Sequence, residues 1–429
     1  MSDEDFTPQL PWAEPAWLTS LESPYYNESH RKLQAYARDY INRNILPNNL
    51  KWEQDGDCPD AAKVDYINSG LPFANIPAQY RSRGSESVAG ISADEFDVFH
   101  FMIIGDEAAR IEGGVGIALA GAHAIGVPPI LNHGTEAQRR RWLPGLFTRE
   151  TNFCLGITEP SGGSDVGNIF TKAVKTKDGS HYIVTGTKKW ITGAQWASHM
   201  TTAVRTGGPG IGGISLLVVP LRSEGVEVEK IHNSGQNAGG ASWVRMRNVR
   251  VPVENLLGQE NAGFKYIMTN FNKERFLMAV ICNRKARTCL STALRYAYTR
   301  ETFGQPLVHH QIIRHKIVTL ARGVESHWAW LEQIAYHIQI RGWQSDDVAG
   351  RIALAKVSGG RMLEQAAREA QQVMGGVAYQ KDGPGGGGRI EQITRDLRMM
   401  VVGGGSEEIL GDLAFRQDTK AAQRKPSKL

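Results

Sequence analysis

The sequence has few cysteines, no basic stripe and no long apolar run, and each shortage excludes a class of protein. Only four cysteines occur in 429 residues, and their spacing matches neither a disulfide framework nor a metal-ligand motif. The 49 basic and 44 acidic residues are interspersed along the chain, whereas nucleic-acid binding needs basic residues gathered on one face. We therefore expect a globular protein with reduced thiols, no metal site and no nucleic-acid partner.

The two ends of the chain bear on its targeting. The first residues, "MSDEDFTPQL", are acidic and polar, which is not the pattern of a secretory signal, so synthesis in the cytosol is expected. The chain ends in Ser427, Lys428 and Leu429, which is the address of peroxisomal proteins when it stands at a free C-terminus. We expect a peroxisomal protein that an import receptor binds through Leu429.

The longest uncharged stretch does not predict a membrane span. Residues 113–131, "GGVGIALAGAHAIGVPPIL", are rich in glycine and alanine and contain two prolines and one histidine. A spanning helix needs about 20 predominantly apolar residues. The stretch indicates a buried helix of the core.

Changes of periodicity divide the remaining chain. Apolar residues recur at helical spacing up to "HGTEAQRRRWLPGL". Strand signals follow, because Asp178 and Gly179 form a hairpin turn between two strand-like runs. The helical period then returns, and an apolar face from Ile313 to Ile338 persists for about seven turns. The predicted segments are an N-terminal extension (1–26), a helical domain (27–150), a β domain (151–256), a helical bundle (257–420) and a tail (421–429).

Several stretches in this order resemble the acyl-CoA dehydrogenases. They are "CLGITEPSGGSDVGNIFTKAV", "YIVTGTKKWITG", "RETFGQPLVHHQII", "QVMGG", "RD" and "GGGSEEI". The resemblance implies a mainly α fold with a β domain: an N-terminal α-helical domain, a middle β-barrel-like domain and a C-terminal four-helix bundle. It also implies FAD as cofactor, an acyl-CoA thioester as substrate, and a homo-oligomer, either a dimer or a tetramer.

The residue chemistry of these stretches suits a flavin. Gly162 and Gly163 allow a ligand close to the backbone, and Trp190 offers a flat wall on the same strand face as Thr192 if "KKWIT" is a strand. By itself, Trp190 is more often a core aromatic, but it lies inside the matching motif. By similarity, the residues at the flavin and the phosphates are Ile157, Thr158, Gly163, Ser164, Trp190 and Thr192.

A second set of residues matches those that reach the FAD of a neighbouring subunit or its adenosine side. By similarity these are Arg300, Thr302, Phe303, Gln311, Gln372, Gly376, Ser406 and Glu408. The substrate-binding residues implied by the resemblance are Ser164, Asn272 and Arg275, the last contacting the CoA part.

The catalytic base is not where most relatives have it. In most of the family a glutamate stands eight residues after the aspartate of the "RD" pair, and the same count from Asp396 gives Gly404. Glu407 and Glu408 come later, where acidic residues favour the start of a helix whatever the protein does. The resemblance still implies that the Gly404 amide binds the thioester carbonyl.

A minority of the family, including the isovaleryl and long-chain types, has glycine there and takes the base from a Glu-Arg pair on another helix. The stretch "NFNKERF" contains such a pair, Glu274 and Arg275. By themselves, the three consecutive charged residues Lys273, Glu274 and Arg275 are typical of a solvated helix face. Together with the missing carboxylate, the Glu-Arg pair predicts Glu274 as the general base that removes the α proton.

The leading hypothesis is therefore a peroxisomal FAD-dependent acyl-CoA dehydrogenase. An alternative is a short acyl-CoA oxidase that passes electrons to oxygen, because electron-transfer flavoprotein is mitochondrial. Two further alternatives are an enzyme similar to nitroalkane oxidase or flavin monooxygenases, which would use no CoA ester, and a non-catalytic scaffold that kept the fold.

Overall fold

The computed structural model describes residues 10–82, 84–345 and 347–424. Within these residues the chain forms two compact units. The helical unit is drawn from Met1–Leu50, Asp97–Glu112 and Arg275–Leu429, and the sheet unit from Lys51–Phe96 and Gly113–Glu274. Helices of the first 150 residues therefore contribute to both units.

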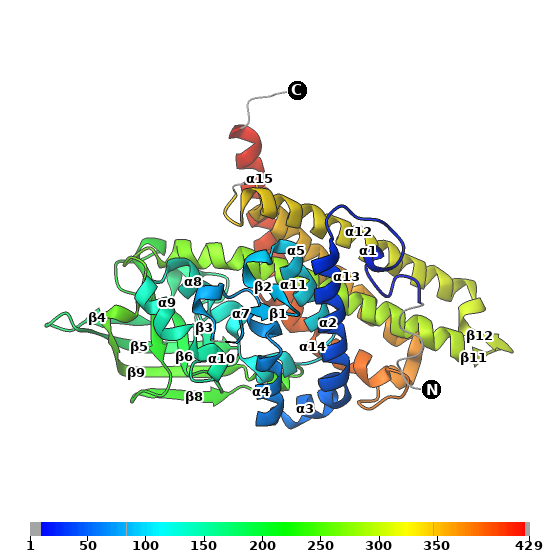
Figure 1. Ribbon diagram of the computed structural model, residues 1–429, viewed down its shortest axis with the longest axis horizontal. Helices are drawn as coiled ribbons and strands as arrows, with labels where there is room; N and C mark the ends of the chain where they lie inside the picture. Colours follow the sequence, from blue (N-terminus) through cyan, green and yellow to red (C-terminus); the bar gives the residue numbers. More distant parts are fainter. Residues whose placement is uncertain (1–9, 83, 346, 425–429) are drawn as a thin grey trace. The chain divides into compact units, whose positions relative to one another are not determined.

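The sheet unit is built on eight strands, several of which lie side by side in Figure 1. The order runs β10-β7-β6-β4-β5-β9-β8, and β3 pairs with β6. The strands are β3 (Phe153–Gly156), β4 (Lys172–Lys175), β5 (His181–Ile191), β6 (His199–Arg205), β7 (Ile214–Pro220), β8 (Val226–Lys230), β9 (Ser242–Pro252) and β10 (Leu256–Leu257). The hairpin predicted at Asp178 and Gly179 is present, since β4 and β5 pair antiparallel across it and Gly179 has φ +71°.

Both faces of the central strands are buried. Along β7, Leu216 and Val218 belong to one apolar cluster, which also contains Trp142 from a helix. Leu217 and Val219 alternate with them and belong to a second cluster, formed with side chains of the other strands. This double burial explains why "ISLLVVPL" is uniformly apolar.

Short helices complete the sheet unit. They are α4 (Asp60–Asn68), α6 (Val115–Ala120), α7 (His123–Gly126), α8 (Pro128–His133), α9 (Glu136–Trp142) and α10 (Gly145–Thr148), while α3 (Asn49–Asp55) begins in the helical unit. The stretch 113–131 is therefore not one buried helix. Gly121 interrupts it with φ +76°, and Pro128 starts a new helix at the position that proline favours.

The helical unit contains the long helices. They are α2 (Glu28–Asn44), α5 (Val98–Ala108), α11 (Gly263–Thr299), α12 (Gln311–Arg341), α13 (Ala349–Met374), α14 (Gly387–Val402) and α15 (Glu407–Arg424), besides the short α1 (Ala16–Thr19). The first part of α11 belongs to the sheet unit. The segment predicted as purely helical, 27–150, also holds one short hairpin of β1 (Ser87–Val88) and β2 (Ile91–Ser92).

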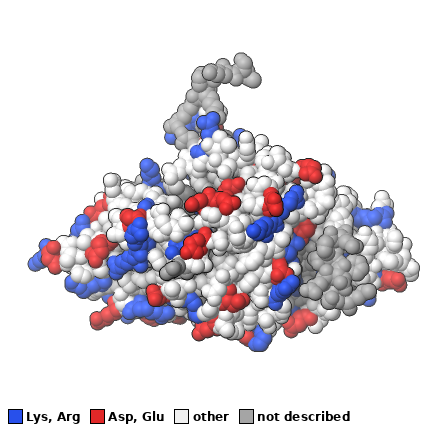
Figure 2. All heavy atoms as spheres, in the orientation of Figure 1, with Lys and Arg blue, Asp and Glu red and all other residues white. Residues whose placement is uncertain are grey.

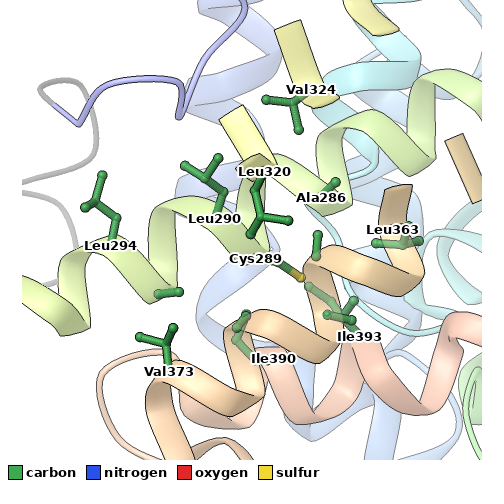
Figure 3. Packing of buried hydrophobic residues seen from close by; sticks show 14 of the residues in the cluster. Ala286, Cys289, Leu290, Leu294, Leu320, Val324, Leu363, Val373, Ile390 and Ile393 are labelled. Carbon is green, nitrogen blue, oxygen red and sulfur yellow. The ribbon is translucent and has the colours of Figure 1, made fainter. Parts of the chain in front are cut away.

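Four of these helices, α11 to α14, form a bundle around one apolar core, as the fold prediction requires. Figure 3 shows Leu290 of α11, Leu320 of α12, Leu363 of α13 and Ile390 of α14 packed together. The apolar face predicted between Ile313 and Ile338 lies along α12 and is buried through most of its length.

All four cysteines are buried. Burial raises the pKa of Cys58, Cys282 and Cys289 to about 12, and it raises that of Cys154 as well. Each cysteine is a free thiol. Cys282 and Cys289 belong to the core of the bundle.

Charges of both signs are mixed over the face of the molecule drawn in Figure 2, and no basic stripe is visible on that face. None of the described helices has the length and apolar character needed to cross a membrane.

Candidate active site

The segment Ile157–Ser164 leaves the end of β3 and folds into a tight turn. Glu159 and Gly162 exchange two backbone N–H···O hydrogen bonds of 3.0 and 3.2 Å. A side chain at Gly163 would meet no described atom within 4 Å, so the space beside this exposed residue is open. Thr158, at the entrance of the turn, is partly buried. The turn thus presents accessible backbone where the sequence predicts contact with a flavin.

A buried ion pair anchors this turn to strand β5. Lys188 is fully buried, and its Nζ donates to Glu159 Oε1 at 2.8 Å and to the carbonyl of Ile157 at 3.0 Å. The carboxylate also accepts the backbone N–H groups of Phe170 at 2.6 Å and Thr171 at 3.0 Å. Burial lowers the pKa of Lys188 to about 8, against the attraction of the carboxylate. Burial would raise the pKa of Glu159, but Lys188 and these hydrogen bonds hold it below its usual value.

Strand β5 is interrupted by a bulge at Trp190. The pairing with β9 shifts register between Lys188 and Ile191, and Trp190 has φ +63°, an unusual backbone for an aromatic residue. The ring is 50% exposed, and the Lys189 ammonium lies 4.7 Å from its centroid. Bulges redirect side chains near active sites. The expectation that Trp190 and Thr192 share a face by simple alternation does not hold, because the bulge breaks the alternation and β5 ends before Thr192.

Helix α11 carries the predicted base. Asn272 and Glu274 are partly buried, and Arg275 is buried. Burial lowers the pKa of the intervening Lys273 to about 8. Partial burial of a carboxylate raises its pKa toward neutrality, which suits a general base.

Three glycines form the turn between α14 and α15. Gly404 has φ +69° and Gly405 has φ +120°, so glycine is favoured at both positions. Arg275 Nε donates to the carbonyl of Gly404 at 2.8 Å, and Lys356 Nζ donates to the carbonyl of Gly405 at 2.9 Å. Both cationic side chains are buried. They fix the carbonyls of the turn that contains the predicted hydrogen-bond donor, Gly404.

The two glutamates after this turn are exposed or nearly so. The Arg361 guanidinium donates two hydrogen bonds to the Glu407 carboxylate, at 2.6 and 2.5 Å, and lowers its pKa. Hydrogen bonds from its own backbone amide and from Ser406 lower the pKa of Glu408. Solvated carboxylates with lowered pKa values are poor general bases at neutral pH.

The residues predicted to reach a neighbouring subunit's FAD lie at the surface of the helical unit. A small hairpin of β11 (Glu301–Thr302) and β12 (Gln305–Pro306) follows α11. At its tip Phe303 has φ +53° and is 97% exposed. Thr302 and Ser406 are partly buried. The other members of the set are exposed in the single chain: Arg300, Gln311, Gln372, Gly376 and Glu408.

One group of imidazoles and a carboxylate also has the spacing of metal ligands. In the helical unit, His30 Nε2 and His100 Nδ1 lie 3.0 and 2.8 Å from the same oxygen of Asp97. Both histidines also take part in capping boxes at the starts of α2 and α5. Helix capping therefore explains this cluster without a metal.

Sequence reasoning did not single out Lys188, Glu159 or Lys356. Lys356 had a recognisable signal, since it interrupts an apolar helical face between Ile352 and Leu363. A lysine at such a position has to be buried with hydrogen-bond partners. The sequence alone does not show which partners those are.

Comparison with known proteins gives consistent matches over nearly the whole chain. Residues 27–150, 154–249 and 261–417 match the N-terminal, middle and C-terminal domains of acyl-CoA dehydrogenases. The acyl-CoA dehydrogenase apdG of Emericella nidulans is 40% identical over 430 residues, and the acyl-CoA dehydrogenase AFT10-1 of Alternaria alternata is 41% identical over 428 residues. Each alignment covers 98% of this chain and 98% of the relative. The crystal structure of a probable acyl-CoA dehydrogenase from Mycobacterium abscessus has a TM-score of 0.82 at 32% identity, covering 92% of this chain and 99% of that one.

Proposed function

The chain belongs to the acyl-CoA dehydrogenase family, and from this premise we propose that it catalyses the FAD-dependent α,β-dehydrogenation of an acyl-CoA thioester. The observation that carries the proposal is the hydrogen bond from Arg275 to the Gly404 carbonyl at 2.8 Å. It ties the Glu-Arg pair of α11 to the glycine turn that lacks the usual carboxylate. The arginine next to the proposed base therefore contacts the turn where most relatives carry theirs.

The residues of the chain fit FAD. At Gly163 and Gly376 a side chain would meet no described atom within 4 Å, so both sites leave open space beside the backbone. The bulge leaves the Trp190 ring half exposed, as a wall for a planar ring system requires. We assign the flavin and its phosphates to Ile157, Thr158, Gly163, Ser164, Trp190 and Thr192. FAD, when bound, supplies the acceptor for the hydride that leaves the β carbon.

Glu274 acts on the α carbon of the substrate. Its carboxylate takes the α proton, and the electron pair of that C–H bond moves into the thioester to form an enolate-like charge on the carbonyl oxygen. As the β hydride leaves, the same electrons form the double bond between the α and β carbons. Asn272, Arg275 and Ser164 are the residues we assign to the acyl-CoA.

Gly404 stabilises the charge that develops on the thioester oxygen. A backbone amide donates a hydrogen bond whatever the side chain, so glycine can serve here as well as the usual glutamate. A donor fixed before the reaction contributes more than one that must reorganise. The hydrogen bonds from Arg275 and Lys356 to the carbonyls of Gly404 and Gly405 in this turn supply that fixity.

The exposed residues at the ends of α11 and α13 favour an oligomer of at least two chains. Phe303, at the tip of the hairpin, is 97% exposed in the single chain. Binding of a neighbouring subunit's FAD by Arg300, Thr302, Phe303 and Gln311, with Gln372, Gly376, Ser406 and Glu408 on the adenosine side, would cover it. A homotetramer is the usual assembly of the family.

Our proposals for the compartment and the electron acceptor rest on the terminal Ser427-Lys428-Leu429, which lies outside the described residues. This tripeptide supports import into peroxisomes through a receptor that binds Leu429. Because electron-transfer flavoprotein is mitochondrial, a peroxisomal location also favours the second candidate, a short acyl-CoA oxidase that reduces oxygen.

Anaerobic mixing of the FAD-loaded protein with a panel of CoA thioesters of different length and branching tests the proposal. At least one ester should bleach the flavin absorbance, and the product should contain an α,β double bond. Hydrogen peroxide produced on turnover in air would identify the oxidase. If no CoA ester bleaches the flavin, the protein is a nitroalkane-oxidase-like enzyme or a scaffold, and bleaching by nitroalkanes separates these two.

A further inference from the structure

The glycine turn is held from the side of two neighbouring helices. Lys356 of α13 donates to the carbonyl of Gly405 at 2.9 Å and also to the carbonyl of Val401. Arg275 of α11 donates to the carbonyl of Gly404 at 2.8 Å. Three carbonyls that flank or belong to the turn are thus bound by two cationic side chains, all within the helical unit.

The turn has little conformational preference of its own beyond the hydrogen bond from the Gly405 amide to the Val402 carbonyl, at 3.3 Å. Gly403, Gly404 and Gly405 follow one another, and glycine has the largest choice of backbone conformations of any residue. Because the peptide group is planar, a carbonyl fixed on one side fixes the N–H group of the next residue on the other side. The Lys356 and Arg275 contacts therefore immobilise the Val401–Val402, Gly404–Gly405 and Gly405–Ser406 peptides, which lie before and after the Gly403–Gly404 peptide that carries the Gly404 amide.

The burial of the Lys356 ammonium group costs free energy, and this cost needs an explanation. Lys356 is 1% exposed on the inner face of α13, and burial of an ammonium group is strongly unfavourable unless hydrogen bonds compensate. Lys285, another buried lysine among the described residues of this unit, donates to the Glu112 carboxylate. A methionine would fill the volume of Lys356 without the cost of burying a charge.

We propose that Lys356 is a positioning residue for catalysis, which holds the turn so that the Gly404 amide points at the thioester oxygen of the substrate. The inference rests on the proposed function. Lys356 does not touch the substrate. It acts through the backbone of Val401 and Gly405, and its ammonium polarises the Gly405 carbonyl, which strengthens the Ser406 amide in the same peptide as a donor.

The proposal predicts a specific loss. Without Lys356 the amide is still present but is no longer fixed, so the enolate-like oxygen loses stabilisation while the CoA part still binds. The turnover number should fall by about tenfold to a hundredfold, below the full loss of about 10² to 10³ seen when an oxyanion donor is removed. The KM should change little, because ground-state binding uses the amide less than the transition state does.

Ionisation of a bound substrate analogue gives a readout that a general loss of stability would not move. In a 3-thiaacyl-CoA, sulfur replaces the β carbon, so no hydride can leave and only the α proton is lost. The enolate then accumulates, and in the FAD-loaded protein its charge-transfer interaction with oxidised flavin would absorb at long wavelength. A pH titration of this absorbance measures the acidity of the bound analogue in the FAD-loaded protein.

The variants are Lys356→Met, Lys356→Arg and the matched control Lys285→Met, which also removes a buried lysine of the helical unit. In Lys356→Met the titration midpoint should rise by about one to two pH units, since one unit is a tenfold change in acidity. Lys356→Arg keeps the charge and donors and should recover part of the shift. Lys285→Met should lower thermal stability but leave the midpoint of the analogue unchanged.

The outcomes separate the inference from the proposed function. If the wild-type protein ionises the analogue and Lys356→Met does so with the same midpoint, the positioning role is wrong. Equal shifts in Lys356→Met and Lys285→Met would overturn it too, because they would reflect loosening of the whole unit. If the wild type does not ionise the analogue, the proposed function fails and the inference falls with it. Should Lys356→Met not fold, Lys356→Gln is read by the same criteria.

Discussion

The Arg361 guanidinium donates two hydrogen bonds to the Glu407 carboxylate, of 2.6 and 2.5 Å. Arg361 is an exposed residue of α13, and this ion pair lies at the start of α15. The Glu407 carboxylate is therefore held in an ion pair at the surface. This contact supports the proposal that the base is not Glu407 but comes from another part of the chain.

Glu274→Gln should lower the rate of flavin reduction by at least about a hundredfold, the usual scale for a lost general base. The amide keeps the shape of the side chain but cannot accept the α proton, so FAD and substrate binding should persist. Glu407→Gln is the matched control and should retain most activity. Rapid-mixing measurements of flavin reduction with an accepted CoA ester check both variants. Near wild-type reduction in Glu274→Gln would refute the assignment of the base.

Lys188→Met should destabilise the protein more than Lys189→Met on the same strand. The first change leaves the Glu159 carboxylate buried without its ammonium, which typically costs about 3–5 kcal/mol. The second removes cation–π contacts with Trp190 and Trp243, worth about 0.5–1 kcal/mol at partly exposed sites. Thermal unfolding of the two variants gives the comparison. Equal losses would mean that the buried pair does not anchor the Ile157–Ser164 turn.

His327 should make the helical unit less stable in acid. Its Nε2 donates to the carbonyl of Ala355 at 2.8 Å, so Nδ1 is the acceptor for Asn283 Nδ2 at 3.2 Å. Burial lowers its pKa to about 4, below the value of about 6.5 in the unfolded chain. Between these values the unfolded state binds the proton more readily, so stability is lost as the pH falls from about 6.5 to about 4, by up to about 3 kcal/mol.

Denaturant unfolding at several pH values measures this loss. His327→Gln should flatten the pH dependence in that range, whereas His315→Gln, at an exposed position of the same helix, should leave it as in the wild type. An unchanged pH profile in His327→Gln would contradict the argument.

The purified protein should be yellow with FAD and at least dimeric. Arg300→Ala should weaken FAD retention, because this exposed arginine is assigned to a neighbour's cofactor, and Arg322→Ala, an exposed arginine of α12, should not. Light scattering gives the mass in solution, and the absorbance ratio of flavin to protein gives the FAD content. A colourless monomer that does not take up added FAD would contradict this prediction.

Removal of Leu429 should abolish peroxisomal import. A fluorescent protein fused to the N-terminus leaves the Ser-Lys-Leu end free, and the full chain should then colocalise with a peroxisomal marker. The control is the same fusion with two further residues after Leu429, which should remain in the cytosol. A fusion that keeps the free end and yet stays cytosolic would disprove peroxisomal targeting.

Local pattern was sufficient to predict the long helices and the hairpin of the sheet. The apolar side chains of α12 recur at helical spacing, and Asp178-Gly179 fixes a turn whose geometry depends on those two residues. The bulge at Trp190 was not predictable in this way. It depends on how β5 pairs with β9, a strand far along the chain.

The candidate site was predictable as a set of residues but not as a set of contacts. The absence of a carboxylate at Gly404 pointed to Glu274 through the family resemblance alone. The hydrogen bonds of Arg275 and Lys356 join α11 and α13 to the glycine turn. Both residues are distant from this turn in sequence. No periodicity encodes such contacts, because they follow from the packing of whole helices.

The burial of all four thiols makes this protein a convenient object for site-specific labelling. The thiolate is the reactive form of cysteine, and burial with a raised pKa leaves each native thiol slow toward maleimides. A cysteine introduced at Tyr379, which is 85% exposed, would be the one fast-reacting thiol of the folded chain. A fluorophore attached there would report on the end of α13 as ligands bind, with every native cysteine left in place.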